Sequence, residues 1–273
     1  MADKNGRIAF IGGGNMAGAI IGGLLQRGLT AADLLVVEPF AEARTRLAQQ
    51  FGVQAQEAAG PALADASLVV WAVKPQTFRE AAAACRPHVG QALHLSVAAG
   101  IRSDSIAQWL GTERLVRSMP NTPALVGKGM TALYARAGVD ASDKLRVEQV
   151  VATTGEHLWV QQEQHLDAVT ALSGSGPAYV FYFLEAMVQA GTEMGLPPQQ
   201  ARRLAVGTFA GAAELARASE EPLQTLRERV TSKGGTTYAA LTSLEQDQVQ
   251  ASFVRALHAA CKRAAELGDE FGK

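Results

Sequence analysis

The sequence is poor in cysteine and has no clustered histidines. Cys85 and Cys261 are its only two cysteines among 273 residues, and they lie far apart without the spacing of a zinc ligand pair. This pattern argues against a disulfide framework, a structural zinc site and a dithiol redox centre. We expect both cysteines to be small buried hydrophobic residues. The five histidines are isolated along the chain, so neither a metal site nor a catalytic dyad is expected.

Long apolar runs and an excess of one charge are also missing. No uncharged apolar run approaches the roughly 20 residues that cross a bilayer. The segment Met1–Asn5 leads directly into an expected strand without the apolar core of a signal peptide, so we expect a cytoplasmic protein. The formal net charge is -1 and the basic residues are spread along the chain. Neither a membrane nor a nucleic acid is therefore an expected partner.

The first part of the sequence has the pattern of an α/β fold. From Arg7 to about Gln161, short apolar runs alternate with helical stretches, as in parallel strands joined by crossover helices. Several runs are apolar throughout, which predicts a sheet covered on both faces. The expected strands are Ile8–Gly12, Leu34–Glu38, Leu68–Val73, Leu93–Val97, Leu115–Ser118, Met130–Tyr134 and one near His157–Val160.

The remainder of the sequence is helical in pattern. After about Gln162, alanine-rich segments carry apolar residues at spacings of three and four. One such stripe ends at Gly195, and Pro197-Pro198 then indicates a new helix start. The sequence thus predicts a Rossmann-like parallel-sheet domain at 1–162 and an all-α domain at 163–273. One domain with a large helical appendage fits the length equally well. Small residues on the helical faces favour dimerisation, although an internal bundle without a partner has the same periodicity.

A glycine-rich segment after the first expected strand indicates a dinucleotide site. Gly12, Gly14 and Ala17 occupy the three small positions of a G-x-G-x-x-A pattern that opens a helix. Gly12 permits a tight turn, Gly14 leaves room for phosphates, and Ala17 allows close packing of helix on strand. A pyrophosphate would then bind the unpaired amides at the helix N-terminus. A glycine-rich turn without a ligand is the alternative.

The end of the second expected strand bears on the choice of cofactor. A carboxylate at Glu38 can accept bonds from the adenine ribose hydroxyls and repel the 2′-phosphate of NADP, which favours NAD. Arg44, one or two helical turns further on, can reach a phosphate instead. The choice between NADH and NADPH therefore stays open, and a solvated carboxylate is the alternative for Glu38.

Three further segments follow strand ends, where ligands of open sheets bind. They are Ala72–Pro75, Ser96–Gly100 and Met119–Pro123. The small residues of the second would admit the nicotinamide side of a cofactor. Asn121, held between two prolines, can offer its amide to the nicotinamide carboxamide, or it can simply form an Asn turn.

The helical half contains two glycine-rich segments. Leu172–Tyr179 is expected to be a flexible, amide-rich break before a long apolar helix. The segment Val230–Tyr238 separates two helices and exposes several amides at a helix start, an arrangement that binds a small carboxylate. An ordinary glycine linker is the alternative for the second segment.

Taken in order, these motifs resemble one enzyme family. The segments GGGNM, AVKP, SVAAG, MPNTP, ALSGSGPAY and TSKGGTT, spread over a Rossmann half and a helical half, are similar to those of pyrroline-5-carboxylate reductase. The resemblance runs from Ile8 to the last helix. It implies NADPH- or NADH-dependent reduction of (S)-1-pyrroline-5-carboxylate to L-proline, the last step of proline biosynthesis. It also implies a homodimer, or a larger ring of dimers, in which the helical domain of a second subunit completes the active site.

The resemblance also implies roles for individual residues. Thr237 would be the catalytic residue that hydrogen-bonds the ring nitrogen, and Lys233 would act as an electrostatic helper. The cofactor-binding residues would be Ile11, Gly12, Gly13, Gly14, Asn15, Met16, Ala17, Glu38, Ala72, Val73, Lys74, Pro75, Ala98, Ala99 and Asn121. The substrate-binding residues would be Ser175, Glu220, Ser232, Gly234, Gly235, Thr236 and Thr237, with no metal involved.

Other functions share parts of this pattern. A reductase of the same two-domain layout could act on a β-hydroxyacid or on a different imine. A catalytically silent dimer that senses the dinucleotide would bind the cofactor but oxidise none of it. A methyltransferase fits less well, since the helical half offers no second adenosine pocket.

Overall fold

The computed structural model describes residues 6–272 and separates into two compact units. The first unit combines the chain up to Ser175 with the chain from Ala260 onward, and the second unit is Gly176–Ala259. These units are defined by contacts and are a different division from the domains expected at 1–162 and 163–273. That domain boundary stays a prediction.

The first unit is built on one seven-stranded sheet. Its strand order is β2-β1-β3-β4-β5-β6-β7, and the neighbours from β2 to β5 pair in parallel. All seven expected strands are confirmed, with ends that differ by one or two residues. The strands are β1 (Arg7–Ile11), β2 (Leu34–Val37), β3 (Ala66–Trp71), β4 (Leu93–Ser96), β5 (Leu115–Met119), β6 (Gly129–Ala135) and β7 (Gly155–Trp159).

The predicted Rossmann-like parallel-sheet fold is confirmed, and the last two strands add one antiparallel pair to it. β6 pairs with β5 in antiparallel orientation, and β7 runs parallel to β6. The connection from β5 to β6 holds only the short 3-10 helix η3 (Thr122–Val126). A parallel neighbour needs a crossover of about a dozen residues or more, usually through a helix. The connection from Met119 to Gly129 is too short for such a crossover, so the chain turns back.

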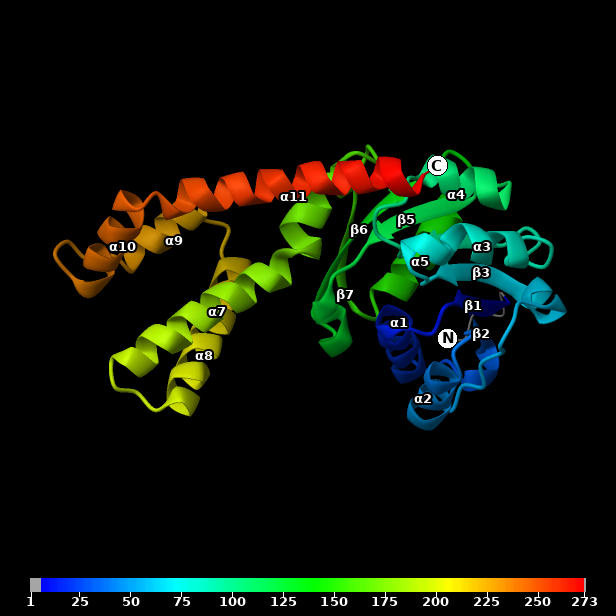
Figure 1. The fold of residues 1–273 in the computed structure, drawn as a ribbon, viewed down its shortest axis with the longest axis horizontal. Coiled ribbons are helices and arrows are strands. Elements are labelled where there is room, and N and C mark those ends of the chain that lie inside the picture. Colours follow the sequence, from blue (N-terminus) through cyan, green and yellow to red (C-terminus); the bar gives the residue numbers. More distant parts are fainter. Residues whose placement is uncertain (1–5, 273) are drawn as a thin grey trace. The chain divides into compact units, whose positions relative to one another are not determined.

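Helices cover both faces of the sheet, as the apolar strands predict (Figure 1). Alternate residues of β1 point to opposite faces, so Ile8 and Phe10 join one core while Ala9 and Ile11 join the other. The first core takes in α1 (Asn15–Gln26), α2 (Ala41–Phe51) and α5 (Ala141–Val151), and the second takes in α3 (Pro75–Cys85) and α4 (Ser103–Leu110).

The end of the chain packs into the second core. Phe271, near the end of α11 (Val249–Phe271), lies against this core, and Gly272 accepts a hydrogen bond from the Ser105 hydroxyl at 2.9 Å. A Cβ at Gly100, whose φ is +72°, would lie 3.3 Å from Leu267. The last turns of α11 therefore belong to the structure of the sheet unit.

Burial is the main cause of a pKa shift at two side chains of this unit, His94 and Cys85. Burial, with a smaller effect of the Arg114 charge, lowers the pKa of His94 to about 4, and its Nδ1 accepts a hydrogen bond from the Trp71 indole at 3.0 Å. Burial raises the pKa of the Cys85 thiol to about 11. Cys85 is thus the small buried residue that we expected, whereas Cys261 is only half-buried.

The second unit consists of helices. α7 (Gly176–Glu193) and α8 (Pro198–Ala218) lie side by side (Figure 1). Between them, Gly195 has a φ of +96° and Pro197 caps α8, which confirms the predicted stop and restart. α9 (Leu223–Arg229), α10 (Thr236–Gln246) and the first part of α11 complete the unit. Phe253 of α11 packs its ring edge-on against Tyr179 and Phe183 of α7, with centroids 5.6 and 5.7 Å apart.

Residues 6–272 contain no helix long and apolar enough to cross a membrane. The same residues contain no cluster of three or more histidine, cysteine, aspartate or glutamate side chains arranged to hold a metal ion.

Candidate active site

The order in which successive strands are added to the sheet reverses at β1. Such a reversal places a crevice at the carboxyl edge of the sheet. From β1 the chain moves outward to β2, and it then returns to the other side of β1 to form β3. Loops that leave two adjacent strands in opposite directions open a crevice, and ligands of open sheets bind there. The segment Gly12–Gly14 follows β1 and Ala72–Lys74 follows β3, so two of the predicted cofactor segments flank this crevice.

The glycine turn has the geometry that a pyrophosphate site requires. Gly12 has a φ of +97°, and a Cβ there would lie 2.6 Å from the carbonyl oxygen of Ala72. A Cβ at Gly14 would have no atom within 4 Å, so the space in front of it is open. No side chain caps α1, and the amides of its first turn, Asn15 to Ala17, have no intrahelical partner. The residues present therefore fit a bound pyrophosphate.

Glu38 is buried, which corrects the alternative that it is a solvated carboxylate. Its exposed fraction is 5%. Oε2 accepts a hydrogen bond from the amide of Gly13 at 2.7 Å, and Oε1 accepts one from the amide of Phe40 at 2.8 Å. The carboxylate therefore fixes the glycine turn to the end of β2. Its contact with a ribose stays a prediction.

Two arginines of α2 lie near this carboxylate, and they differ in their partners. Arg44 donates to the carbonyl oxygens of Glu38 and Pro39 at 3.0 and 2.6 Å and pairs with Glu57 at 3.1 Å. Arg46 donates to the carbonyl oxygen of Gly13 at 3.2 Å. The sequence pattern pointed to Arg44 and not to Arg46. Arg46 could have been found from its position directly before Leu47, whose side chain packs against the glycine turn.

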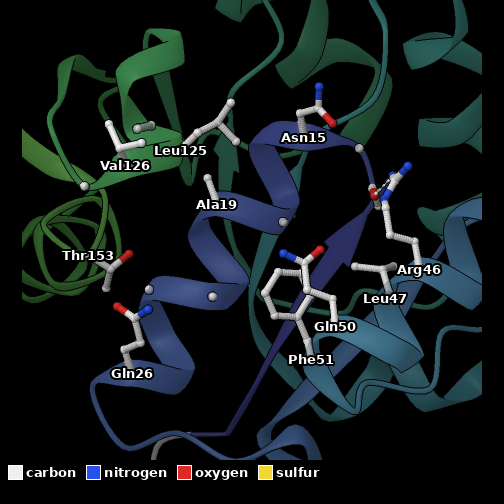
Figure 2. A pocket seen from close by; sticks show the side chains of 17 residues that line it. Asn15, Ala19, Gln26, Arg46, Leu47, Gln50, Phe51, Leu125, Val126 and Thr153 are labelled. Carbon is white, nitrogen blue, oxygen red and sulfur yellow. Dashed lines mark hydrogen bonds between the residues drawn. The ribbon is translucent and has the colours of Figure 1, made fainter.

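Arg46 also lines a cavity of about 540 Å³ that begins at the glycine turn. Its walls come from α1, α2 and η3 (Figure 2). Figure 2 shows the Arg46 side chain reaching from α2 to the turn, with Asn15 beyond it at the start of α1. Leu125 and Val126 of η3 contribute an apolar rim and are exposed by 56% and 76%. The cavity thus has polar groups at the glycine turn and an apolar rim at η3.

The loops after β3 and β4 present backbone and small side chains at the same edge. Lys74 is exposed and caps α3, where its carbonyl accepts a hydrogen bond from the Thr77 amide at 3.1 Å. Ala98 is buried and donates its amide to the Ser96 hydroxyl at 3.3 Å, while Ala99 is exposed. Because Ala99 is small and exposed, a flat ring can approach its surface.

Asn121 ties two loops of the first unit together. Its amide nitrogen lies 3.2 Å from both the carbonyl and the hydroxyl oxygen of Ser173, and its amide oxygen accepts from the Met130 amide at 2.9 Å. Both ends of the side chain therefore have protein partners. A direct contact with a nicotinamide stays a prediction. It requires Asn121 to give up one of its hydrogen bonds to Ser173 or Met130.

The segment before α7 is helical, which corrects the expected flexible break. α6 (His165–Val169) continues into a single π-helical stretch, Thr170–Gly174, and the Ser175 amide donates to the Thr170 carbonyl at 2.8 Å. A Cβ at Gly174 would lie 2.4 Å from the end of Met119. The glycine thus serves close packing, and a widened turn of this kind is frequent at functional sites.

The predicted substrate loop lies in the second unit. Gly234 has a φ of +74° and Gly235 is the N-cap of α10, with no side chain capping the helix. The amides of Thr236, Thr237 and Tyr238 have no intrahelical partner. Thr237 is half-buried, and Ser232 lies within 2.7 Å of where a Gly235 Cβ would be. The loop therefore offers several donors to a small anion.

Glu220 lies apart from these donors in sequence. It is exposed in the connection between α8 and α9, where its neighbour Glu221 pairs with Arg229. Its part in substrate binding stays a prediction, as does the role of Lys233, which is also exposed.

Comparisons with known proteins cover nearly the whole chain. A family model described as pyrroline-5-carboxylate reductase dimerisation matches residues 163–267, and one described as NADP oxidoreductase, coenzyme F420-dependent, matches residues 7–100. The chain is 44% identical over 269 residues to the pyrroline-5-carboxylate reductase of Pseudomonas aeruginosa, with 98% of each protein covered.

Solved structures give the same result. A pyrroline-5-carboxylate reductase from Coxiella burnetii is 36% identical with a TM-score of 0.89, and 97% of this chain and 99% of that chain are covered. A pyrroline carboxylate reductase from Plasmodium falciparum, solved with NADP bound, is 28% identical with a TM-score of 0.87 and the same coverage. The similarity extends over both the sheet and the helices.

Proposed function

Because the chain belongs to the pyrroline-5-carboxylate reductase family, we propose that its glycine turn and its α10 loop form the two half-sites of that reaction. The chain reduces 1-pyrroline-5-carboxylate to proline. The assignment of residues to the two half-sites is our proposal. It rests on two helix N-termini without side-chain caps, one at α1 and one at α10.

The cofactor half-site is the carboxyl edge of the sheet. We propose NADPH as the cofactor, supported by the NADP bound to the Plasmodium falciparum relative and by the family model over residues 7–100. A bound nicotinamide supplies the hydride that reduces the C=N bond. The chain's own part is positioning: the α1 amides hold the pyrophosphate, Glu38 fixes the turn, and Ala98 and Ala99 leave room for the ring.

The substrate half-site is the start of α10. The observation that carries it is an open first helical turn that follows two glycines and places two threonines beside three unpaired amides. The amides and the Ser232 and Thr236 hydroxyls bind the substrate carboxylate. The Thr237 hydroxyl accepts or donates a hydrogen bond at the ring nitrogen. A threonine hydroxyl is too weak an acid to supply a full proton, so the imine binds already protonated or takes its proton from water.

We further propose that the two half-sites work within a homodimer in the cytoplasm. The dimerisation model over residues 163–267 supports the dimer, and the large apolar side chains exposed on the second unit support it independently. Assembly into a ring of dimers is a further step that a measurement of mass in solution would detect. The cytoplasmic location is supported by two free cysteines, one of them buried.

The test follows NADPH oxidation in the presence of pyrroline-5-carboxylate for the wild type, Thr237→Ala and Thr242→Ala. Thr242 lies in the same helix, and its hydroxyl donates to the Tyr238 carbonyl at 2.9 Å, so it is a matched control. We expect Thr237→Ala to lose at least about tenfold in kcat/KM, equivalent to about 1.4 kcal/mol of transition-state stabilisation. Equal rates for Thr237→Ala and Thr242→Ala would remove Thr237 from the active site.

A further inference from the structure

We infer that Arg46 is the residue that recognises the 2′-phosphate of NADPH and so determines cofactor preference. This inference rests on the proposed cofactor half-site and assigns a specific role within it. Glu38 lies at the end of β2, where a carboxylate repels the 2′-phosphate of NADPH. The chain must therefore supply a compensating cation nearby if it uses NADPH.

The structure first weakens the argument that Glu38 selects against NADPH. Each of its carboxylate oxygens already accepts a backbone amide, from Gly13 at 2.7 Å and from Phe40 at 2.8 Å. The two amide dipoles offset part of the negative charge. In this arrangement Glu38 fixes the glycine turn and is not a free acceptor extended toward a ribose.

Arg44 is the less suitable of the two nearby cations. One of its terminal nitrogens donates to the carbonyls of Glu38 and Pro39, and the other pairs with the Glu57 carboxylate at 3.1 Å. Its guanidinium is thus occupied in closing the connection between β2 and α2. Binding a phosphate would require it to give up an ion pair.

Arg46 has the donors that a phosphate needs. Its only hydrogen bond among residues 6–272 is the one to the Gly13 carbonyl at 3.2 Å, and it forms no ion pair with a carboxylate of those residues. A guanidinium has five N–H donors and binds phosphates through its planar fork, so most of this capacity is unused. The side chain is exposed, and it reaches the mouth of the cavity beside the start of α1 (Figure 2).

Its place relative to the glycine turn decides which phosphate it meets. Gly13 donates its amide to Glu38 and accepts from Arg46 at its carbonyl, so both side chains contact the same residue of the glycine turn. The pyrophosphate is expected on the amides of Asn15 to Ala17. The adenosine ribose is expected at the end of β2, beside Glu38. Arg46 therefore lies next to the ribose end of the cofactor.

The test uses 2′,5′-ADP and 5′-AMP, which differ only in the 2′-phosphate, and measures their dissociation constants by calorimetry. We expect Arg46→Gln to weaken 2′,5′-ADP by about tenfold or more and to change 5′-AMP by less than about twofold, as expected for loss of a charged hydrogen bond. Arg46→Lys should keep part of the affinity for 2′,5′-ADP that Arg46→Gln loses. In the enzyme assay, the KM for NADPH should rise toward that for NADH with little change in kcat.

Arg27→Gln is the matched control. Arg27 is also exposed and also donates to one backbone carbonyl, that of Ala152, but it lies at the other end of α1. It removes the same net charge, and we expect it to leave the preference between the two nucleotides unchanged. A selective loss with Arg44→Gln, an equal loss for both nucleotides with Arg46→Gln, or no loss at all would overturn the inference.

The same experiment separates this inference from the proposed function. If the wild type binds 2′,5′-ADP more tightly than 5′-AMP and Arg46→Gln keeps that preference, the inference fails and the cofactor half-site stands. If the wild type binds neither nucleotide nor NADPH, the cofactor half-site itself fails.

Discussion

The two units of the molecule differ in how far they bury their large apolar side chains. The sheet unit buries its largest ones completely, among them Trp71, Phe10 and Phe78. In the second unit, whose residues 176–259 are all described, only Gly191, Ala201 and Ala205 are buried. Phe181 and Leu215 of that unit are exposed by 58% and 70%. One unit therefore supplies its own core, whereas the other leaves large apolar side chains exposed, which the proposed dimer would cover.

This difference explains how small residues are used in the two units. In the sheet unit, a Cβ at Gly12 would meet the backbone of the next strand, so the glycine serves a turn within the chain. In the helical unit, Gly191 packs against Ala201 of the neighbouring helix, but a Cβ at Gly207 or Gly211 would have no atom within 4 Å. The latter two glycines have no packing reason within one chain. A second chain in the proposed dimer would supply one.

The largest expected effect comes from placing a charge among the exposed apolar side chains of the second unit. Phe181→Asp should convert the dimer to monomer or aggregate and abolish activity, since a buried unpaired carboxylate is costly. Size-exclusion chromatography with light scattering measures the mass. Leu145→Asp is the matched control, because Leu145 of α5 is exposed by 60% but belongs to the self-contained unit. A Phe181→Asp protein that remains dimeric and active would show that this face is not the interface.

The next largest effect is on stability, and it is tested by truncating one leucine to alanine in each unit. Leu95→Ala in the buried core should destabilise the protein by about 2–5 kcal/mol, because it removes buried methyl groups and leaves a cavity. Leu215→Ala should destabilise only through the dimer, so its effect should depend on protein concentration. Urea unfolding at two concentrations distinguishes them. Identical concentration dependence for both variants would contradict the comparison.

The smallest expected effect is a pH dependence confined to the sheet unit. The pKa of His94 is about 4 in the folded protein, against an ordinary value near 6.5. Between these values the unfolded chain binds a proton that the folded protein does not. Stability from this group is therefore complete above about pH 6.5 and declines as the pH falls toward 4, by about 3 kcal/mol at most. The bond from the Trp71 indole requires an unprotonated Nδ1, which is consistent with this direction.

Urea unfolding between pH 7 and pH 4 measures this effect at fixed protein concentration. His94→Gln should flatten the loss of stability over that range, while His165→Gln, at an exposed position, should follow the wild type. Parallel curves for all three proteins would show that His94 does not titrate as its burial implies.

The sequence was informative where local pattern alone determines structure. The alternation of apolar residues predicts all seven strands, and the G-x-G-x-x-A segment predicts the turn from β1 into α1. The direction of β6 was missed because it depends on how short the connection from β5 is, not on the strand residues themselves. The π-helical stretch at Thr170–Gly174 was missed because no local pattern marks it, and the residue that Gly174 packs against, Met119, is distant in sequence.

The candidate site divides in the same way. The glycines and the α10 loop could be located from spacing, because their conformational needs are local. The burial of Glu38 and the free donors of Arg46 could not, because both depend on which side chains the fold brings to one peptide, that of Gly13. No periodicity in α2 distinguishes Arg44 from Arg46.

The packing of Phe271 against the core of the sheet unit has a consequence for the order of folding. The first strand of this unit begins at Arg7, whereas Phe271 follows the whole of Gly176–Ala259, the second unit, in the sequence. The contacts of Phe271 therefore close a loop that contains the entire second unit. Contacts so distant in sequence carry a loop-closure entropy cost before they contribute stability, so we expect the packing of Phe271 to be a late step in folding.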